Sequence, residues 1–138
     1  MKSTTKWMVT AAALAIATGV ASAQALQAEI PFAFRAGDKI MAAGTYRVEA
    51  RDAQKYLILS NFESRQSAIL LPNWRETPAK GVAARGEPVM VFECASRCEL
   101  IRVWTGYGYP AIAFKRHAPS GGETASLMEI RLVRANGD

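Results

Sequence analysis

Short runs in which every second residue is apolar recur along this chain and constrain its fold more than any other feature. The plainest covers residues 45–49, where Tyr46 and Val48 alternate with polar residues. Glycine, proline or polar clusters separate the runs, and beyond residue 23 no stretch of ten or more residues has helical periodicity. Such alternation is typical of half-buried strands, whose successive side chains point to opposite faces. The sequence therefore predicts an all-β fold.

About eight runs can be distinguished, and we expect each to form one short strand. Eight short strands joined by tight turns favour an antiparallel sandwich or a small barrel, which cover or close their edges. Pro31 in the first run suggests an edge strand. The third and fourth runs are apolar almost throughout, so we expect them to form a central hairpin that is covered on both sides. The runs cover residues 28–34, 45–49, 56–62, 68–71, 89–94, 98–105, 110–115 and 127–133.

The first 23 residues have the layout of an export signal. Two lysines and no acid precede an apolar or small-residue segment at 7–20, and small residues at 21–23 match the site that signal peptidase reads. An uncleaved membrane anchor is the alternative, but about fourteen apolar residues are short of the roughly twenty that span a bilayer. We therefore expect cleavage after Ala23. The product, residues 24–138, is then a single β domain that is periplasmic or secreted and has no transmembrane segment.

The charge of the mature chain bears on its partners. Removing the two lysines of residues 1–23 lowers the 17 basic residues to 15 against 12 acids, which is a net charge of about +3. These charges are interspersed, whereas nucleic-acid-binding proteins usually concentrate lysine and arginine on one face or arm. We therefore expect no nucleic-acid partner.

Cys94 and Cys98, the only cysteines, form the most specific motif of the mature chain. Disulfides form and persist in the oxidising compartments that exported proteins enter. If the three residues between the cysteines make a hairpin loop, the two cysteines face one another at a distance that a disulfide spans. Alternation then places them on the face of Phe92 and Leu100. We expect a disulfide that staples a hairpin.

The same hairpin register sets Glu93 directly opposite Glu99. Like charges in such a cross-strand pair destabilise a sheet. Either Arg97 or Arg102 relieves the repulsion, or the register is shifted.

A metal site is the main alternative use of the cysteines. Cys94, Cys98 and His117 supply three soft or borderline ligands, with Met90 as a fourth, which suits copper. A redox-active dithiol is a further alternative, although the pair lacks the helix N-terminus that usually lowers a thiol pKa. As a staple, the pair implies no cofactor.

His117 is the only histidine, so a hydrolase that needs a histidine base must use it. No Gly-x-Ser-x-Gly or comparable nucleophile motif occurs in the chain. We interpret His117 as a solvated loop residue and expect the protein not to be an enzyme. A small hydrolase stays as a third hypothesis.

Four aromatic residues, Trp74, Trp104, Tyr107 and Tyr109, are the candidates for ligand contact. Three of them lie around a glycine-rich turn, and Trp74 lies in the long connection 72–88. Flat amphipathic rings stack on sugars or on protein surfaces and lose little conformational entropy. As the alternative, Trp104 shares strand parity with Leu100 and belongs to the core.

The segments Ile-Pro-Phe-Ala-Phe-Arg-Ala-Gly at residues 30–37 and Ala-Gly-Thr-Tyr-Arg-Val at 43–48 resemble a group of uncharacterised small secreted bacterial proteins. Those proteins share Ile-Pro-Phe-x-Phe, a glycine turn and Pro-Ala-Gly-x-Tyr-x-Val. Here Ala42 replaces the usual proline. The resemblance implies a small β fold and export, but no activity, ligand or catalytic residue. Independently of it, Gly37 and Gly44 flank the connection between the first two strands, where glycine tolerates positive φ.

Together these features predict an exported, non-enzymatic β domain that serves as a binding or structural module at the cell envelope. Its partner is then an envelope or extracellular protein or a glycan. The alternative is a periplasmic, copper-type metal-handling protein that uses Cys94, Cys98 and His117.

Overall fold

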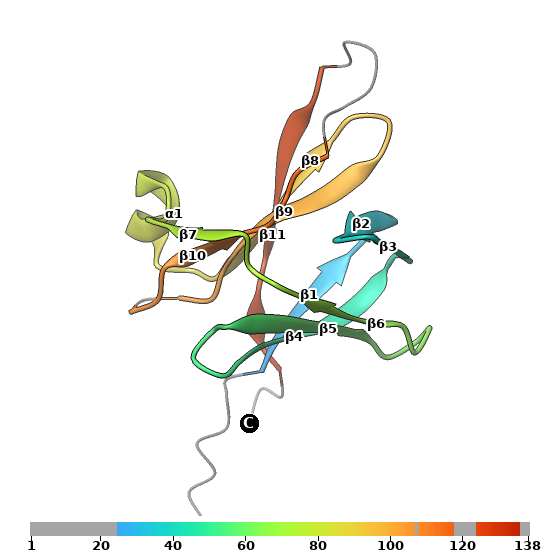
Figure 1. Cartoon of the computed structure of the whole chain (residues 1–138), viewed down its shortest axis with the longest axis horizontal. Helices are drawn as coiled ribbons and strands as arrows, with labels where there is room; N and C mark the ends of the chain where they lie inside the picture. The colour runs from blue at the N-terminus through green and yellow to red at the C-terminus, as the bar shows by residue number, and fades with distance from the viewer. Residues whose placement is uncertain (1–24, 107, 118–123, 136–138) are drawn as a thin grey trace, which may run out of the picture.

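The computed structural model describes residues 25–106, 108–117 and 124–135, and within them the chain forms two sheets (Figure 1). The expected cleavage site at Ala23 lies outside these ranges. The predicted all-β fold is confirmed, and of the two predicted architectures it is the sandwich, because the sheets do not close into a barrel. No helix in these ranges is long and apolar enough to cross a bilayer.

The first sheet is antiparallel and has five strands. Its order is β12 (Val133–Arg134), β1 (Leu26–Ile30), β4 (Gly44–Arg51), β5 (Tyr56–Asn61) and β6 (Ser67–Leu70). The alternation predicted at residues 45–49 is confirmed, because Tyr46 and Val48 are fully buried while their neighbours are half-buried.

The second sheet has seven strands in the described residues, and β9 is its centre. The order of the main path is β11 (Ser126–Arg131), β8 (Val89–Cys94), β9 (Cys98–Trp104), β10 (Ala111–Ala113) and β7 (Trp74–Glu76). β10 pairs with the C-terminal half of β9, and β2 (Phe34–Ala36) pairs in parallel with the N-terminal end of β9. β3 (Lys39–Met41) forms a hairpin with β2.

Aromatic rings fill the space between the two sheets. The Phe34 ring makes edge contacts with Tyr46 of the first sheet and with Phe92 of the second, both at a centroid distance of 5.2 Å. Phe32 contacts Phe92 in the same way at 5.1 Å. Burial raises the pKa of Tyr46, whose hydroxyl donates a hydrogen bond to the carbonyl oxygen of Ala42. Such ring pairs contribute about 0.5–1.5 kcal/mol beyond the apolar area that they bury.

A second, smaller core covers the outer face of the second sheet. It forms under α1 (Lys80–Arg85), a short helix inside the connection 72–88 that the sequence did not predict. The same connection also contains β7, which pairs with β10, and it is followed directly by β8. The members of this core are Val82, Val89, Val91, Ile101, Trp104 and Ala111.

A β-bulge decides which residues of β9 face which core. Val91 pairs with Arg102, but Phe92 pairs with Leu100, so Ile101 is an extra residue in β9. An extra residue interrupts the alternation of faces along a strand. Leu100 therefore faces the main core while Trp104 faces the smaller one. The burial predicted for Trp104 is confirmed, but the prediction that it shares a face with Leu100 is wrong.

The chain passes from one sheet to the other within the first and last predicted strands. Residues 31–33 join β1 of the first sheet to β2 of the second, and the buried Leu132 lies between β11 and β12. Each of these two predicted strands therefore corresponds to two observed strands. Pro31 lies beyond β1, which pairs with neighbours on both sides, so the predicted edge strand is wrong.

The β5–β6 hairpin is not central, although its apolar sequence predicts that it is. β6 is the last strand of the first sheet, and the side chains of Ile69 and Leu71 are exposed. Only the inward-facing residues of the hairpin, such as Leu59 and Leu70, are buried. The outer face of the hairpin is an apolar surface without a cover in the described residues.

Two glycines are required by the backbone and by space. Gly37 has a φ of +61° in the two-residue turn between β2 and β3. Gly44 has a φ of +154°, and a Cβ atom there would lie 2.7 Å from Nδ2 of the buried Asn61. The predicted positive φ at both glycines is confirmed.

We expect Gly44→Val to lower the free energy of unfolding by about 2 kcal/mol or more, because it combines a strained φ with a clash against a buried side chain. Urea denaturation followed by circular dichroism measures this change. Gly81→Ala in α1 is the matched control, since its new Cβ meets only the end of Arg85 at 4.0 Å. The control is expected to stabilise the protein by roughly 0.5–1 kcal/mol. A fully stable Gly44→Val variant would contradict the described packing.

Candidate functional site

The predicted disulfide is confirmed at the tip of the β8–β9 hairpin. Cys94 and Cys98 pair directly in the register, and their Cα atoms are 4.0 Å apart. Both residues are half-buried and pack against the main core, on the side of Phe92 and Leu100 as alternation predicts. In this oxidised form the two sulfur atoms are bonded to each other, so neither is a free thiolate. No group of three potential metal-binding side chains occurs in the described parts of the chain.

The predicted like-charge pair is also confirmed, because Glu93 lies opposite Glu99. The residues that contact the two acids are not the predicted ones. Arg116 forms an ion pair with Glu93, and His117 lies against Glu99. Arg102 pairs with another acid, Glu76. Two consecutive residues after β10, Arg116 and His117, therefore contact the two acids of the hairpin.

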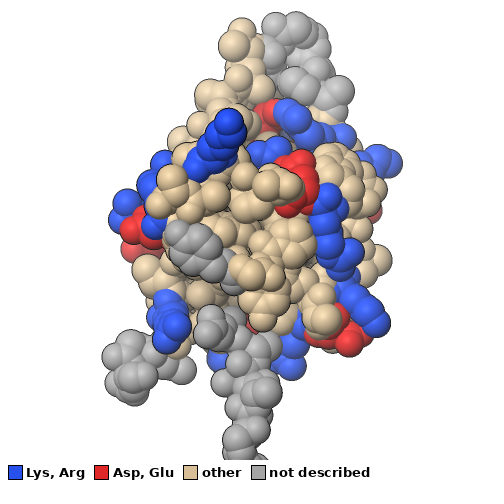
Figure 2. All heavy atoms as spheres, turned by 90° about the vertical axis from the view of Figure 1, so that its left-hand side faces the viewer, with Lys and Arg blue, Asp and Glu red and all other residues tan. Residues whose placement is uncertain are grey.

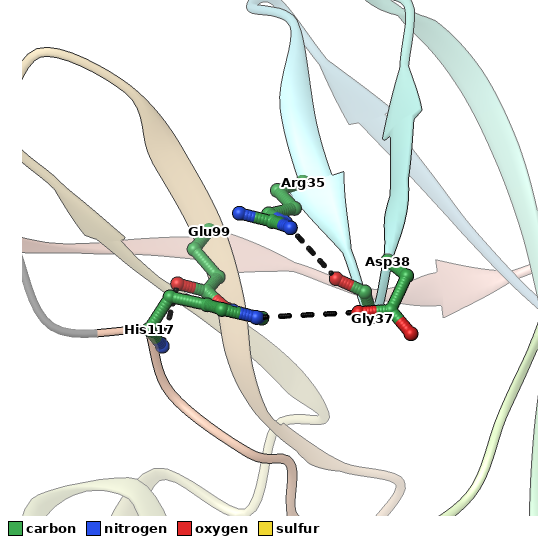
Figure 3. A network of polar contacts seen from close by, with 5 residues as sticks. All are labelled: Arg35, Gly37, Asp38, Glu99 and His117. Atoms are coloured by element: carbon green, nitrogen blue, oxygen red, sulfur yellow. Dashed lines mark hydrogen bonds and ion pairs between the residues drawn. The ribbon is translucent and has the colours of Figure 1, made fainter.

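His117 is bound to Glu99 by two hydrogen bonds (Figure 3). Its backbone N–H donates to Oε2 at 3.1 Å, and its Nδ1 lies 2.6 Å from Oε1. The carboxylate that accepts them belongs to a residue that is only 8% exposed. On the other side of the ring, Nε2 lies 4.0 Å from Oδ1 of Asp38 in the β2–β3 turn. His117 thus joins two segments to β9, and its interpretation as a solvated loop residue is wrong.

This arrangement orients an imidazole ring but offers it no nucleophile in the described residues. Both ring nitrogens face carboxylates, whereas a catalytic base must face the hydroxyl or thiol that it activates. Ser120 lies outside the described residues. The Nε of Arg35 donates a hydrogen bond to the carbonyl oxygen of Gly37 at 3.2 Å and so stabilises the turn that carries Asp38 (Figure 3). The cluster is best described as a structural junction.

The four candidate aromatic residues divide into three groups. Trp74 on β7 is 44% exposed and Tyr109, just before β10, is 55% exposed. Trp104 is only 2% exposed, so its predicted role in ligand contact is wrong. Tyr107 lies outside the described residues. Trp74 pairs with Ala113 at one end of β10, and Tyr109 precedes the other end of that strand. We call these two exposed residues the aromatic face.

Hydrogen bonds hold both exposed aromatic residues in place. The indole Nε1 of Trp74 donates to Oε2 of Glu76 at 3.2 Å. The buried Trp104 donates from its Nε1 to the carbonyl oxygen of Tyr109 at 3.0 Å, so it fixes the backbone of the turn. A buried residue, Trp104, therefore positions the exposed residue Tyr109 through its backbone.

A buried glutamine that the sequence did not indicate anchors the same region. Gln54, in the turn between β4 and β5, donates from Nε2 to Oγ1 of Thr105 at 2.6 Å. The backbone carbonyl oxygen of Gln54 accepts a hydrogen bond from Nη2 of Arg75, next to Trp74, at 2.8 Å. Asp52, Ala53 and Gln54 all have positive φ, which is unfavourable for residues other than glycine. These tertiary bonds tie a turn of the first sheet to the strands that carry the aromatic face.

A hollow of about 250 Å³ lies between the end of α1, β8 and β11. Its lining arginines each pair with a lining acid, Arg85 with Glu129 at 2.8 Å and Arg131 with Glu87 at 3.0 Å. The charges of the hollow therefore compensate one another, and it offers no charged group in excess for a ligand.

We expect the Cys94→Ala/Cys98→Ala variant to lose about 2 kcal/mol of stability, because closing so small a ring restricts the unfolded chain by that amount. Chemical denaturation of oxidised, reduced and variant protein measures the loss. The reduced wild type is expected to match the variant. Equal stability of the oxidised and reduced forms would contradict a stapling role.

We expect His117→Ala to cost about 1–3 kcal/mol, because the carboxylate of Glu99 stays buried without its ring partner. In a Glu99→Gln background the same substitution is expected to cost much less, since no buried charge is left behind. A double-mutant cycle by urea denaturation checks both values. Equal costs in the two backgrounds would show that the contact contributes nothing.

The chain matches no protein-family model, no curated protein and no solved structure. The resemblance to small secreted proteins at residues 30–37 and 43–48 stays a prediction.

Proposed function

We propose that this chain is an exported, non-catalytic binding module of the cell envelope that contacts its ligand through the aromatic face. The observation that carries the proposal is the state of Trp74 and Tyr109. Both are large and exposed, and hydrogen bonds hold the indole of Trp74 on β7 and the backbone carbonyl of Tyr109 just before β10.

Fixed aromatic side chains suit binding for an energetic reason. A ligand that stacks on a ring gains contact area, while a side chain that is already held loses little conformational freedom. Trp74 fulfils both conditions, because its ring is 44% exposed and its Nε1 is bonded to Glu76. For Tyr109, whose ring is also exposed, the bond from Trp104 holds the backbone of its turn. A purely structural role would leave the exposure of both rings without a use.

The distribution of charge on this side of the molecule is compatible with stacking. Figure 2 shows the side of β7, β10 and α1, where an area of uncharged described atoms is bordered by charged side chains of both signs. An uncharged centre with a polar rim is the usual layout of a binding surface. A ligand of this face therefore needs flat apolar surfaces and hydrogen-bonding groups around them, as saccharides and peptides have.

Two observations support export. Residues 1–23 have the layout of a cleaved signal, and the Cys94–Cys98 disulfide is of a kind that persists in oxidising compartments. In the envelope of a bacterium, peptidoglycan combines saccharide and peptide in one polymer. We therefore take it as the first ligand to test.

The test is sedimentation of residues 24–138 with purified insoluble peptidoglycan. All residues of both cores lie between Leu26 and Leu132, so this form contains the whole described fold. The Trp74→Ala/Tyr109→Ala variant is expected to bind at least tenfold more weakly, because central aromatic contacts contribute about 2 kcal/mol or more. Its melting temperature is expected to stay nearly unchanged. Leu127→Ser, at another exposed apolar side chain, is the matched control.

Two results would contradict the proposal. One is wild-type protein that does not sediment with peptidoglycan or with other envelope polysaccharides. The other is equal loss of binding in the Leu127→Ser control, which would show that the aromatic face has no special role. A large fall in the melting temperature of the double variant would identify Trp74 and Tyr109 as structural residues instead.

A further inference from the structure

The outer face of the β5–β6 hairpin carries an apolar strip that neither core uses. Ile58 and Ile69 pair directly across the two strands. Phe62 at the hairpin turn is 60% exposed, Ile69 is 68% exposed, and Leu71 is 73% exposed. We call these four residues, Ile58, Phe62, Ile69 and Leu71, the apolar strip. Ser60 and Ser67 pair between Phe62 and the Ile58–Ile69 pair, so two hydroxyl side chains interrupt the strip. Exposed apolar side chains gathered on an edge strand mark an interaction site.

Cations border the apolar strip on the β4 side. The register places Glu49 next to Ile58, and Arg47 and Arg51 lie on the same outer face two residues to either side of Glu49. Both arginines form ion pairs with this one carboxylate. The side chain of Glu49 is 15% exposed, against 39% for Arg47 and 50% for Arg51. The border on β4 therefore presents one net positive charge, and its exposed part is guanidinium.

Two further cations lie at the other margins of the strip. Lys39 of β3 donates from Nζ to the carbonyl oxygen of Ser67 in β6 at 2.7 Å. Arg65 is exposed in the turn that also carries Phe62 and the acid Glu63. The exposed acid Asp38 directly precedes Lys39. With these included, four cations and three acids border the strip, an excess of one positive charge.

We propose that the apolar strip and its cationic border bind the surface of an anionic phospholipid bilayer. The apolar side chains enter the boundary between headgroups and acyl chains, and the arginines and Lys39 contact lipid phosphates. This gives the protein a second contact surface, on other strands than the aromatic face, which would hold it at a membrane while the aromatic face stays available.

Charge and shape favour this occupant over the alternatives. Two copies that met face to face through the strip would bring their cationic borders together, which like charges oppose. A protein partner must provide holes for side chains that project as far as Phe62 and Leu71, whereas a bilayer accommodates them without a preformed shape. An anionic bilayer satisfies both the apolar and the cationic part of the surface.

The experiment is co-sedimentation of residues 24–138 with phosphatidylglycerol vesicles and, in parallel, with phosphatidylcholine vesicles at low salt. We expect binding to the anionic vesicles only. Phe62→Ser/Ile69→Thr/Leu71→Ser is expected to weaken it at least tenfold without a fall in melting temperature, because these side chains are exposed. Leu127→Ser/Val133→Thr removes exposed apolar side chains elsewhere and is expected to bind like the wild type.

A second variant tests the charges. Arg51→Gln/Arg65→Asn removes two cations, and asparagine tolerates the positive φ of +57° at position 65. Each cation near an anionic surface contributes about 1 kcal/mol, so we expect binding to weaken roughly thirty-fold and to fall with added salt. Trp74→Ala/Tyr109→Ala is expected to leave vesicle binding unchanged, which separates this proposal from the peptidoglycan test.

Three results would overturn the proposal. The first is wild-type protein that binds neither kind of vesicle, and the second is equal binding to both kinds. The third is a wild-type dimer in analytical ultracentrifugation that becomes monomeric in the Phe62→Ser/Ile69→Thr/Leu71→Ser variant. That result would show that a second copy occupies the strip.

Discussion

The contact of Phe34 with Tyr46 and Phe92 is the interaction on which the rest of this structure depends. It joins β2 and β8 of the second sheet to β4 of the first, and all three side chains are fully buried. The chain crosses between the sheets from β1 to β2 and again at Leu132, so the two sheets are linked near both ends of the described chain. Separating them would expose this core to water. The surfaces that carry the aromatic face and the apolar strip are outer surfaces of these two packed sheets.

Alternation along single strands predicted local features well. It placed Tyr46 and Val48 inward and Cys94 opposite Cys98, and the structure confirms both. It does not reveal an inserted residue such as Ile101, since a bulge depends on the partner strand. Nor does it indicate which sheet a segment joins, so each of the runs 28–34 and 127–133 was one predicted strand but forms two.

The candidate site was predictable only in part, for the same reason. Residue type and position in the sequence indicated Trp74 and Tyr109 as ligand contacts, and both are exposed. Trp104, indicated in the same way, lies in the smaller core because of the bulge. The contact of His117 with Glu99 joins residues 18 positions apart across tertiary structure. Gln54 lies in a turn without glycine, so no turn signal indicated that it reaches Thr105.

The central claim is that Trp74 contacts a ligand while Trp104 lies in the smaller core and holds the backbone of Tyr109. These are the only tryptophans of residues 24–138, so fluorescence can distinguish them. The decisive measurement is acrylamide quenching of this form with and without soluble peptidoglycan fragments. The account predicts that the quenchable emission disappears in Trp74→Phe and that the fragments protect it in the wild type. Quenching that the fragments leave unchanged, or that persists in Trp74→Phe, would contradict the account.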